Sequence, residues 1–596
     1  MTWQLRLVRA SPLRCSLSRP NGPWRIPRAS YGCSTRFPAG AFRPSSAKDS
    51  PHPVTCMVIP SPHGGRHLNV QRMLHPGERS THSNKTTDPF RIPSDSAMAT
   101  QTTVSYSTTR TLSTPGRCLN PDNINPHVKE AKYAVRGELA VKAEEYRVKL
   151  ANGDKSLPFD SVIFANIGNP QQLDQKPITF FRQVLSLLEN PHLLDNVEAL
   201  RTSFGYEQDV IDRTKKLLAD VQSVGAYSHS QGAPVIRQSV AKFIEERDGF
   251  PANPQDLFCC AGASSGVSTI LNVICNGPQA GVLVPIPQYP LYTATLSLLN
   301  AQCVPYLLEE QKAWGTDVTA IRTSLAQARS AGTDVRSIVV INPGNPTGAS
   351  LSPQDIKNVL DLAAEEKLVV IADEVYQTNV FQGEFVSFKK RLRQLQQETP
   401  GKYDYVELVS LHSVSKGMVG ECGHRGGYFE LVGFDPEVQA QIYKLVSIGL
   451  CPPVIGQCLL ELMVNPPKEG EGSYELYQKE YNGISAGLHK RALALYKAFQ
   501  QMEGVECQEP QGAMYLFPTI TLPPKAIEAA KAENRAADEF YCLRLLDVPV
   551  FALSPAPASA RKTTLCTSAQ LSWPLVLTGL NGSSSSTPNL WPSINK

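Results

Sequence analysis

The sequence of 596 residues lacks features that would assign it to several common classes of protein. No apolar run approaches the ~18 residues that a membrane-spanning helix needs, which favours a soluble protein without a membrane partner. The fourteen cysteines include no C-x-x-C pair and the eleven histidines lack metal-ligand spacing, so we expect no metal site and no disulfide framework. The net charge of +4 is too small to indicate nucleic acid as a partner.

Acidic residues are missing from the first part of the chain. Residues 1–48 contain nine Arg or Lys and no Asp or Glu, a balance that is typical of a mitochondrial presequence and favours the mitochondrial matrix. The alternatives are an untranslated leader, with translation from Met57, Met73 or Met98, and a cytoplasmic location. Residues 1–118 are rich in Pro, Ser, Thr and Arg without a sustained period, so we predict a disordered or processed leader.

From about Asn120 to Asp547, patterns typical of helices and of strands alternate, and 41% hydrophobic residues allow a sizeable core. Short runs that are apolar on both faces indicate strands of a buried, mostly parallel sheet. Their alternation with helices predicts a doubly wound α/β fold, in which ligands bind beyond the carboxyl ends of the strands. The predicted helices are Lys129–Leu150, Gln231–Arg247, Pro353–Glu366 and Asp435–Val446, and the predicted strands are Gly281–Ile286, Ser337–Ile341, Leu368–Ala372 and Val406–Leu411.

Two of these strands are followed by motifs that could take part in binding or catalysis. Asp373 follows Leu368–Ala372, and an acid at the end of a buried strand needs a cationic partner, for which a protonated pyridine nitrogen would serve. The turn at 342–348 contains two prolines and two glycines and would hold the Asn345 amide where it could donate to a ring oxygen. A helix cap or a metal carboxylate for Asp373, and an ordinary turn for Asn345, are the alternatives.

A third strand is followed by Ser413, Ser415 and Lys416. A lysine at a strand end is placed to be a nucleophile, and burial near other cations would depress its pKa as imine formation requires. Arg425 lies nine residues after Lys416 and directly precedes two glycines. A phosphate between this arginine and the serine hydroxyls would receive charge-assisted hydrogen bonds. A surface lysine and a structural arginine are the alternative.

Two further motifs could bind a phosphorylated ring. Ala263, Ser264 and Ser265 follow the short run Leu257–Ala261 and open a helical pattern, where small residues leave N–H groups free for a phosphate. Tyr289 follows another predicted strand and could stack on a flat cofactor. A plain helix cap and core packing of the tyrosine are the alternatives.

The order of these motifs along the chain resembles that of fold type I enzymes that use pyridoxal phosphate. Several strings are similar to those of eukaryotic alanine aminotransferases, and the resemblance covers about residues 120–547. These strings are Asn123–Gly137, Asn166–Val184, Gly225–Gly232, Pro285–Tyr292 and Gly512–Pro518.

The resemblance implies a mostly parallel seven-stranded sheet flanked by helices, with a smaller α+β domain. It implies the following division of the chain: 119–200, N-terminal part of the small domain and arm; 201–455, large cofactor-binding domain; 456–547, C-terminal part of the small domain. It also implies a homodimer with shared active sites, in which Tyr227 reaches the phosphate held by the partner subunit.

The resemblance further implies a reaction and a set of roles. Lys416 would form an imine with pyridoxal phosphate and move the Cα proton, and Asp373 would keep the pyridine nitrogen protonated. Amino and 2-oxo acids would be the substrates: L-alanine would leave as pyruvate, and 2-oxoglutarate would leave as L-glutamate, by ping-pong kinetics. The remaining implied roles are contacts with the ring oxygen by Tyr376 and Asn345, stacking by Tyr289, phosphate contacts by Ala263, Ser264, Ser265, Ser413, Ser415 and Arg425, and a substrate-carboxylate contact by Gly168.

The chain departs from the family after Asp547. The family continues with an arginine that clamps the substrate carboxylate, whereas residues 548–596 contain no acid, three basic residues and no amphipathic period. Arg561 is a weak candidate to replace the clamp. Two alternatives therefore stay open: another fold type I aminotransferase or lyase, and a catalytically impaired isoform.

Overall fold

The computed structural model describes three stretches with side chains, residues 119–133, 137–164 and 168–547 (apart from the side chain of Ile163), and the backbone of residues 551–552, 554–555 and 567–572. The chain divides into two units, Met1–Ser107 and Thr108–Lys596, and all described residues belong to the second. The predicted leader and Arg561 lie outside the described residues.

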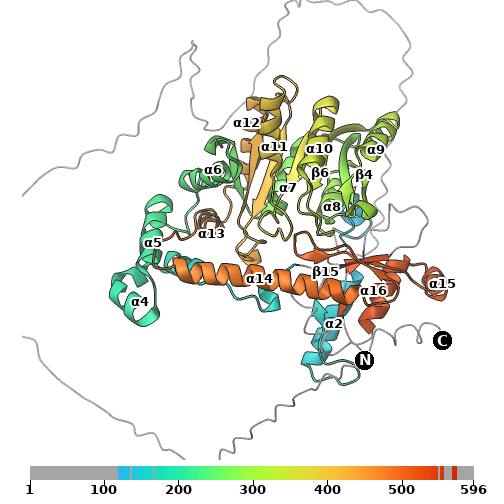
Figure 1. Ribbon diagram of the computed structural model, residues 1–596, viewed down its shortest axis with the longest axis horizontal. Helices are drawn as coiled ribbons and strands as arrows, with labels where there is room; N and C mark the ends of the chain where they lie inside the picture. Colours follow the sequence, from blue (N-terminus) through green and yellow to red (C-terminus); the bar gives the residue numbers. More distant parts are fainter. Residues whose placement is uncertain are drawn as a thin grey trace, which may run out of the picture. The chain divides into compact units, whose positions relative to one another are not determined.

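One eight-stranded sheet lies at the centre of the second unit, with strand order β2-β9-β8-β7-β6-β3-β4-β5 (Figure 1). The five strands β4, β3, β6, β7 and β8 pair in parallel, and β9, β2 and β5 are antiparallel to their neighbours. The predicted fold class is confirmed, with the two-residue β5 as an eighth strand. The bounds are β2 Leu257–Cys260, β3 Ala280–Ile286, β4 Gln302–Glu309, β5 Gly315–Thr316, β6 Asp334–Ile341, β7 Val369–Asp373, β8 Leu408–Ser413 and β9 Gly427–Val432.

The helices surround this sheet and continue into the C-terminal part of the chain. Their bounds are α1 Pro126–Glu130, α2 Glu138–Ala151, α3 Thr179–Glu189, α4 Val197–Phe204, α5 Gln208–Val221, α6 Pro234–Asp248, α7 Ala263–Ile274, α8 Leu291–Leu298, α9 Val318–Ser330, α10 Pro353–Glu366, α11 Phe388–Glu398, α12 Pro436–Ile448, α13 Val454–Val464, α14 Tyr474–Phe499, α15 Pro524–Ala532 and α16 Ala537–Asp547. Among the described residues, no helix combines the length and apolar character that crossing a membrane requires.

Local signals explain where the predicted helices are right and where they are wrong. Helix α10 has the predicted bounds because Ser352 caps it and Asp355 returns the hydrogen bond. The predicted helix Lys129–Leu150 is wrong at its start, because α1 ends at Glu130 and an extended Gly137 precedes α2. Helix α6 begins three residues later than predicted, because Gly232 has a φ of +103° and Pro234 takes the first helical turn.

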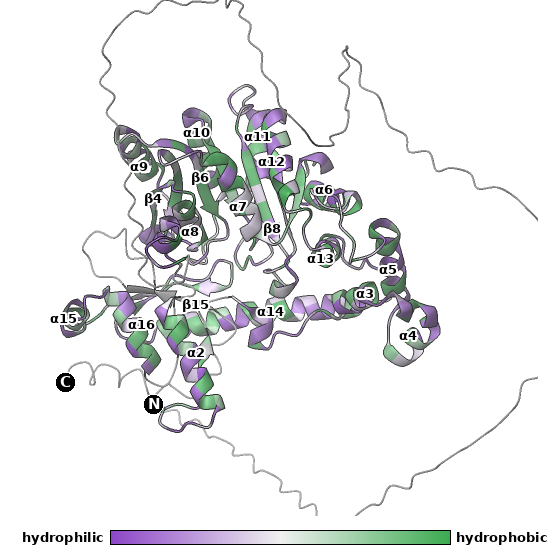
Figure 2. Cartoon of the chain, turned by 180° about the vertical axis from the view of Figure 1, so that it is seen from behind, coloured by the Kyte–Doolittle hydropathy of each residue, from purple (hydrophilic) through white to green (hydrophobic). Residues whose placement is uncertain are grey.

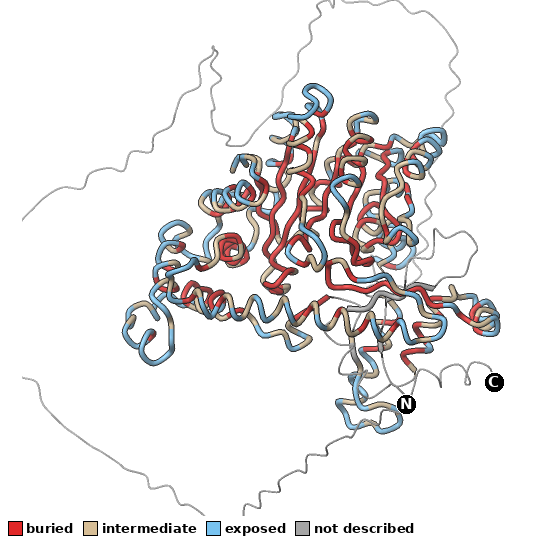
Figure 3. Tube along the Cα trace, in the orientation of Figure 1, coloured by how far each residue is buried: buried red, intermediate tan, exposed pale blue. Residues whose placement is uncertain are grey.

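The central strands are buried on both faces, as their unbroken apolar runs predicted (Figure 3). Alternate residues of β6, β7 and β8 enter two different cores. Ile338, Val370 and Leu408 pack with α9, α10 and α11, whereas Val339, Ile371 and Val409 pack with α7, α8 and α12. Figure 2 shows the hydrophobic colouring concentrated in these strands, with hydrophilic residues along the covering helices.

The C-terminal part of the chain forms a second, smaller α+β layer. Helices α2, α14, α15 and α16 share one core with β11 and β12, which belong to a sheet of order β10-β12-β15-β11 with β14 paired to β15. Strands β13, β14 and β15 come from the tail predicted to be atypical, so segments of that tail pair with β1, β11 and β12. The bounds are β1 Ile163–Phe164, β10 Val505–Glu506, β11 Tyr515–Leu516, β12 Thr519–Ile520, β13 Phe551–Ala552, β14 Ser554–Pro555 and β15 Thr567–Ser572.

Helices from three regions of the chain share another core. α3, α5, α6 and α13 pack together around Phe181, Ile211, Ile236 and Leu459. This core extends across both predicted boundaries, 200/201 and 455/456, which stay predictions.

Candidate active site

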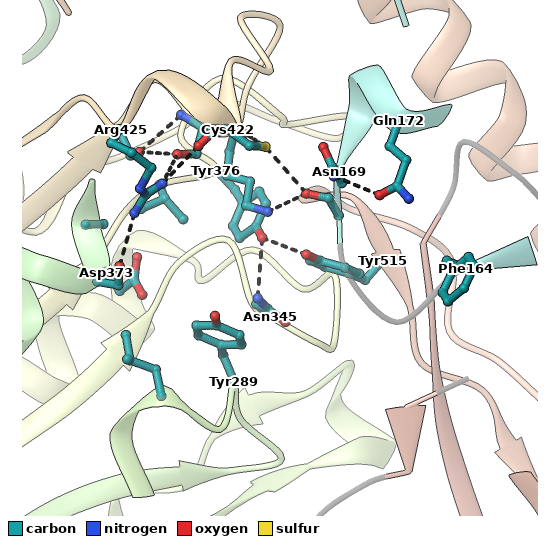
Figure 4. A pocket seen from close by; sticks show the side chains of 18 of the residues that line it. Phe164, Asn169, Gln172, Tyr289, Asn345, Asp373, Tyr376, Cys422, Arg425 and Tyr515 are labelled. Carbon is teal, nitrogen blue, oxygen red and sulfur yellow. Dashed lines mark hydrogen bonds between the residues drawn. The ribbon is translucent and has the colours of Figure 1, made fainter. Parts of the chain in front are cut away.

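A cavity of about 500 Å³ opens at the carboxyl ends of the parallel strands (Figure 4). Its walls come from the sheet, from α2 and the segment after it, and from β11 in the C-terminal part. The lining residues are Ala140, Glu144, Arg147, Phe164, Gly168, Asn169, Gln172, Ala263, Ser264, Tyr289, Leu291, Asn345, Asp373, Val375, Tyr376, Ser413, Ser415, Lys416, Cys422, Arg425 and Tyr515.

Asp373 ends β7 with its carboxyl group buried in the cavity wall. Oδ2 accepts a hydrogen bond of 2.8 Å from the Tyr292 hydroxyl, whereas Oδ1 has no partner among the residues that the structure describes. Burial raises the pKa of this carboxyl group, and the Tyr292 hydroxyl, the Val375 N–H and Lys416 act in the opposite direction. A buried carboxylate oxygen without a partner is costly, so this position calls for a cation or a donor from a ligand.

Lys416 follows β8, the strand next to β7, and lines the same cavity. Its Nζ donates a hydrogen bond of 2.7 Å to the Gly168 carbonyl oxygen and lies 5.9 Å from the centre of the Tyr376 ring. A Cβ at position 168 would lie 3.3 Å from this Nζ and 2.6 Å from the Tyr515 hydroxyl. Glycine at 168 therefore leaves the amine room to reach into the cavity.

Arg425 and the start of α7 form an anion cradle. Arg425 Nη1 donates to the Ser415 hydroxyl at 3.3 Å, and Nη2 donates to the Ala261 carbonyl at 2.9 Å and to the Ser264 hydroxyl at 3.3 Å. Gly262 precedes the helix with a φ of +81°, and a Cβ there would collide with the guanidinium. No side chain of the described residues caps the N-terminus of α7, so its first N–H groups and the arginine can share one anion.

Three polar side chains that line the cavity form a hydrogen-bonded row. Asn345 Nδ2 donates to the Tyr376 hydroxyl at 3.3 Å, and the Tyr376 hydroxyl donates to the Tyr515 hydroxyl at 3.0 Å. All three residues are buried, and burial raises the pKa of Tyr376 well above its ordinary value. Tyr376 is therefore a neutral phenol that can donate a proton to a ligand oxygen.

Tyr289 lies beside this row and is held by the N-terminal segment. Its hydroxyl lies 2.7 Å from the Tyr133 hydroxyl, and the two rings meet edge to face at 6.4 Å. Burial, followed by the bond to Tyr133, raises the pKa of Tyr289. The flat face of a ring in this position is available for stacking on a ligand.

The structure brings together most of the residues that the sequence singled out. Gly168, Ala263, Ser264, Tyr289, Asn345, Asp373, Tyr376, Ser413, Ser415, Lys416 and Arg425 all line the one cavity. Ser265 does not line it, and its N–H bonds the Gly262 carbonyl inside the first turn of α7. Tyr227 is 79% exposed and does not line it either, so its contact with a partner subunit stays a prediction.

The sequence interpretation missed several residues of the wall. Tyr515 lies within the string Gly512–Pro518 that carried the family resemblance, and Asn169 directly follows Gly168, so both could have been found. Glu144 and Arg147 of α2 gave no signal, because an exposed Glu–Arg pair three residues apart is ordinary on a helix surface.

A buried acid next to Asp373 belongs to a separate network. Glu374 is completely buried and accepts hydrogen bonds from the Phe388 N–H at 2.8 Å and from the Ser410 hydroxyl at 2.6 Å. Burial raises the pKa of Glu374 to about 7, against the effect of Arg247. These bonds tie the end of β7 to β8 and to the start of α11.

This shift predicts a measurable pH dependence of folding. Between the unfolded pKa of 4.5 and about 7 the folded chain keeps a proton on Glu374 that the unfolded chain has released, so stability falls as pH rises through this window. In Glu374→Gln this contribution is absent, and the loss of unfolding free energy per pH unit shrinks by up to about 1.4 kcal/mol. Denaturant titrations at pH 5, 6 and 7 measure how the unfolding free energy changes with pH. The exposed Glu384→Gln is the control, and equal slopes in both variants would contradict the assignment.

Comparisons with known proteins identify the family of this chain. The family described as "Aminotransferase class I and II" matches residues 202–554. The alanine aminotransferase, mitochondrial, of Saccharomyces cerevisiae is 54% identical over 437 residues, which are 73% of this chain and 74% of that protein. The inactive alanine aminotransferase of the same yeast is 47% identical, over 73% of this chain and 86% of its own length. Among solved structures, an alanine aminotransferase from Pyrococcus furiosus aligns with a TM-score of 0.57 and 22% identity, over 76% of this chain and 96% of its own.

The fold and the cavity together define a fold type I transferase. At 22% identity the archaeal structure supports the fold alone. The family match and the yeast relatives go further: this chain belongs to the class I and II aminotransferases.

Proposed function

We propose that this chain transfers the amino group of L-alanine to 2-oxoglutarate, with pyridoxal phosphate as its cofactor, and releases pyruvate and L-glutamate. The observation that carries the chemistry is the convergence of Lys416, the free oxygen of Asp373 and Arg425 on one cavity. The observation that supports the substrates is the 54% identity to the yeast protein named alanine aminotransferase.

The cavity fits the chemical features of pyridoxal phosphate one by one. Asp373 Oδ1 offers a buried acceptor for a protonated ring nitrogen, and the cradle of Arg425, Ser264 and the α7 N-terminus offers donors for a phosphate. Tyr376 and Asn345 offer donors for a ring oxygen. When bound, this cofactor supplies an electron sink for the negative charge that remains after loss of the Cα proton.

The protein side chains supply the remaining chemistry. Lys416 is the only lysine among the described residues that line the cavity, so it is the amine that we assign to covalent attachment and to moving the proton at the substrate Cα. Asp373 keeps a positive charge on the ring nitrogen, because a buried carboxylate stabilises a neighbouring cation. Gly168, whose carbonyl already orients Lys416, leaves room for the substrate carboxylate.

We also propose a homodimer and a mitochondrial location. The 79% exposed ring of Tyr227 supports a site completed by a second copy, since it contributes nothing to the cavity of its own chain. The yeast relative named mitochondrial and the basic, acid-free residues 1–48 support the compartment.

A substrate panel tests the proposed reaction. L-Alanine should bleach the visible absorbance of the cofactor-loaded protein and release pyruvate, and kcat/KM should exceed that for L-aspartate or L-phenylalanine by at least about 100-fold, the range that a shaped pocket can give. Equal rates with all three donors would contradict L-alanine as the substrate. Rates measured with glyoxylate and with 2-oxoglutarate identify which of the two accepts the amino group faster.

A chain that binds the cofactor without turnover is the second candidate. It is favoured by the end of the family match at residue 554, which leaves residues 555–596 outside the match, and by the 47% identity to the inactive yeast relative. Apart from Lys416, the basic side chains among the described lining residues are Arg425, which belongs to the anion cradle, and Arg147, which pairs with Glu144. Neither arginine is therefore free to bind a substrate carboxylate. Visible absorbance that L-alanine fails to bleach would favour this candidate.

A further inference from the structure

We propose that Tyr515 is a positioning residue: the segment Gln511–Tyr515 fixes the two loops that carry Asn345 and Tyr376, and the Tyr515 hydroxyl sets the hydrogen bond that Tyr376 offers to a ligand. The inference rests on the proposed function only in that pyridoxal phosphate is the ligand. It does not depend on which amino acid is the substrate.

The segment Gln511–Tyr515 is bonded to the turn that carries Asn345. The Gly512 N–H donates to the Gly348 carbonyl at 2.8 Å, and the Ser350 N–H donates to the Gln511 side-chain oxygen at 2.9 Å. Gly348 has a φ of +73°, and a Cβ there would lie 2.6 Å from the Tyr515 carbonyl oxygen. The two backbones therefore approach as closely as glycine alone permits.

The same segment is bonded to the loop that follows Tyr376. The Ala513 N–H donates to the Asn379 carbonyl at 2.8 Å, and the Phe381 N–H donates to the Gln511 carbonyl at 2.7 Å. Asn379 in turn closes a turn onto the Tyr376 carbonyl at 2.7 Å. One short stretch from the C-terminal part thus ties together two loops that lie far from it in the sequence.

The side chain completes the arrangement. The Tyr515 ring is 2% exposed, meets the Tyr376 ring edge to face at 5.8 Å, and shares a core with Met418 and Leu516. Its hydroxyl lies 3.0 Å from that of Tyr376. Figure 4 shows this hydrogen bond as a dashed line. Both hydroxyls can reverse their roles as donor and acceptor, because each phenol carries one proton and lone pairs.

This reversal gives Tyr515 its effect. When Tyr376 donates its proton to a ligand oxygen, its own oxygen is free to accept from Tyr515. A phenol that accepts a hydrogen bond becomes a better donor, since neighbouring hydrogen bonds polarise one another. Tyr515 therefore strengthens the bond from Tyr376 to the ring oxygen without touching that oxygen itself.

The test is Tyr515→Phe in the full-length chain loaded with pyridoxal phosphate, with the 92% exposed Tyr405→Phe as a matched control. The first readout is the pH midpoint of the visible absorbance, measured without amino acid. A weaker bond from Tyr376 leaves more negative charge on the ring oxygen. This charge holds the proton on the nitrogen that joins Lys416 to the cofactor more tightly. The midpoint should therefore move up by about 0.4–1 pH unit in Tyr515→Phe and stay in place in Tyr405→Phe.

Kinetics and a double variant separate positioning from a general structural role. We expect kcat to fall by about 2–10-fold in Tyr515→Phe, with KM for the amino acid within about 2-fold of the parent. In a Tyr376→Phe background, Tyr515→Phe should leave the midpoint unchanged, because it acts through the missing hydroxyl.

The outcomes distinguish this inference from the proposed function. An unchanged midpoint in Tyr515→Phe overturns the inference even in a chain that transaminates L-alanine. A further shift in the Tyr376→Phe background overturns it as well. A shifted midpoint in a chain that does not turn over L-alanine supports the inference and contradicts the proposed substrate.

Discussion

Lys416→Ala should lower kcat by about 10⁴-fold, the upper part of the range for a positioned acid–base group. The variant loses the amine that donates to the Gly168 carbonyl, and no other lysine among the described lining residues can take its place. It should also lose the covalent contribution to cofactor absorbance. Steady-state pyruvate formation and the visible spectrum of the loaded protein measure the two effects.

Lys242→Ala is the matched control for this experiment. Lys242 is 66% exposed on α6 and pairs with Glu246 on the same helix, an arrangement worth only a few tenths of a kcal/mol. This variant should match the parent in rate and spectrum. A parent-like spectrum in Lys416→Ala would mean that another amine holds the cofactor.

Asp373→Asn should give the second largest effect, with kcat lower by about 10²–10³-fold. Asparagine has nearly the same shape but carries no charge, so it cannot stabilise a protonated ring nitrogen. The magnitude is that of removing one preorganised electrostatic contact from a buried site. Single-turnover measurements with L-alanine in the parent and in the variant quantify the loss.

The same substitution should make the cofactor-free protein more stable at neutral pH. The pKa of Asp373 is raised in the folded chain, so its contribution to stability is present below pH 3.8 and is lost as pH rises through the folded pKa. Asparagine removes this penalty, so the melting temperature without cofactor should rise while activity falls. The exposed Asp404→Asn should change neither quantity. A lower melting temperature in Asp373→Asn would contradict the conclusion that the buried Asp373 carboxylate destabilises the cofactor-free protein.

The sheet could be predicted from the sequence because its strands are short, apolar runs with polar motifs at their carboxyl ends. Parallel strands that are buried on both faces are apolar at every position rather than at alternate positions. The packing of Ile338 and Val339 into the cores on opposite faces of the sheet follows from this pattern. The start of α2 could not be placed by periodicity alone, because the pattern continued through an extended Gly137. Local backbone conformation overrides periodicity at such positions.

Much of the candidate site could also be predicted, because Asp373 ends β7, Lys416 follows β8, and parallel strands end at one edge of the sheet. Arg425 lies at the same edge because it comes two residues before β9, which is antiparallel to β8. Tyr515 and Tyr133 are different, because Tyr515 lines the cavity and Tyr133 contacts Tyr289 from regions distant in sequence from the sheet motifs. Only tertiary contacts reveal that their hydroxyls meet those of Tyr376 and Tyr289.

Trapping the cofactor on its lysine tests the central claim most directly, namely that Asp373, Lys416 and Arg425 surround one molecule of pyridoxal phosphate. The full-length chain is incubated with pyridoxal phosphate, reduced with borohydride, digested and mapped by mass spectrometry. We predict one equivalent of reduced cofactor per chain on the peptide that contains Lys416. Stoichiometric labelling of a different lysine, with Lys416 unmodified, would contradict the account.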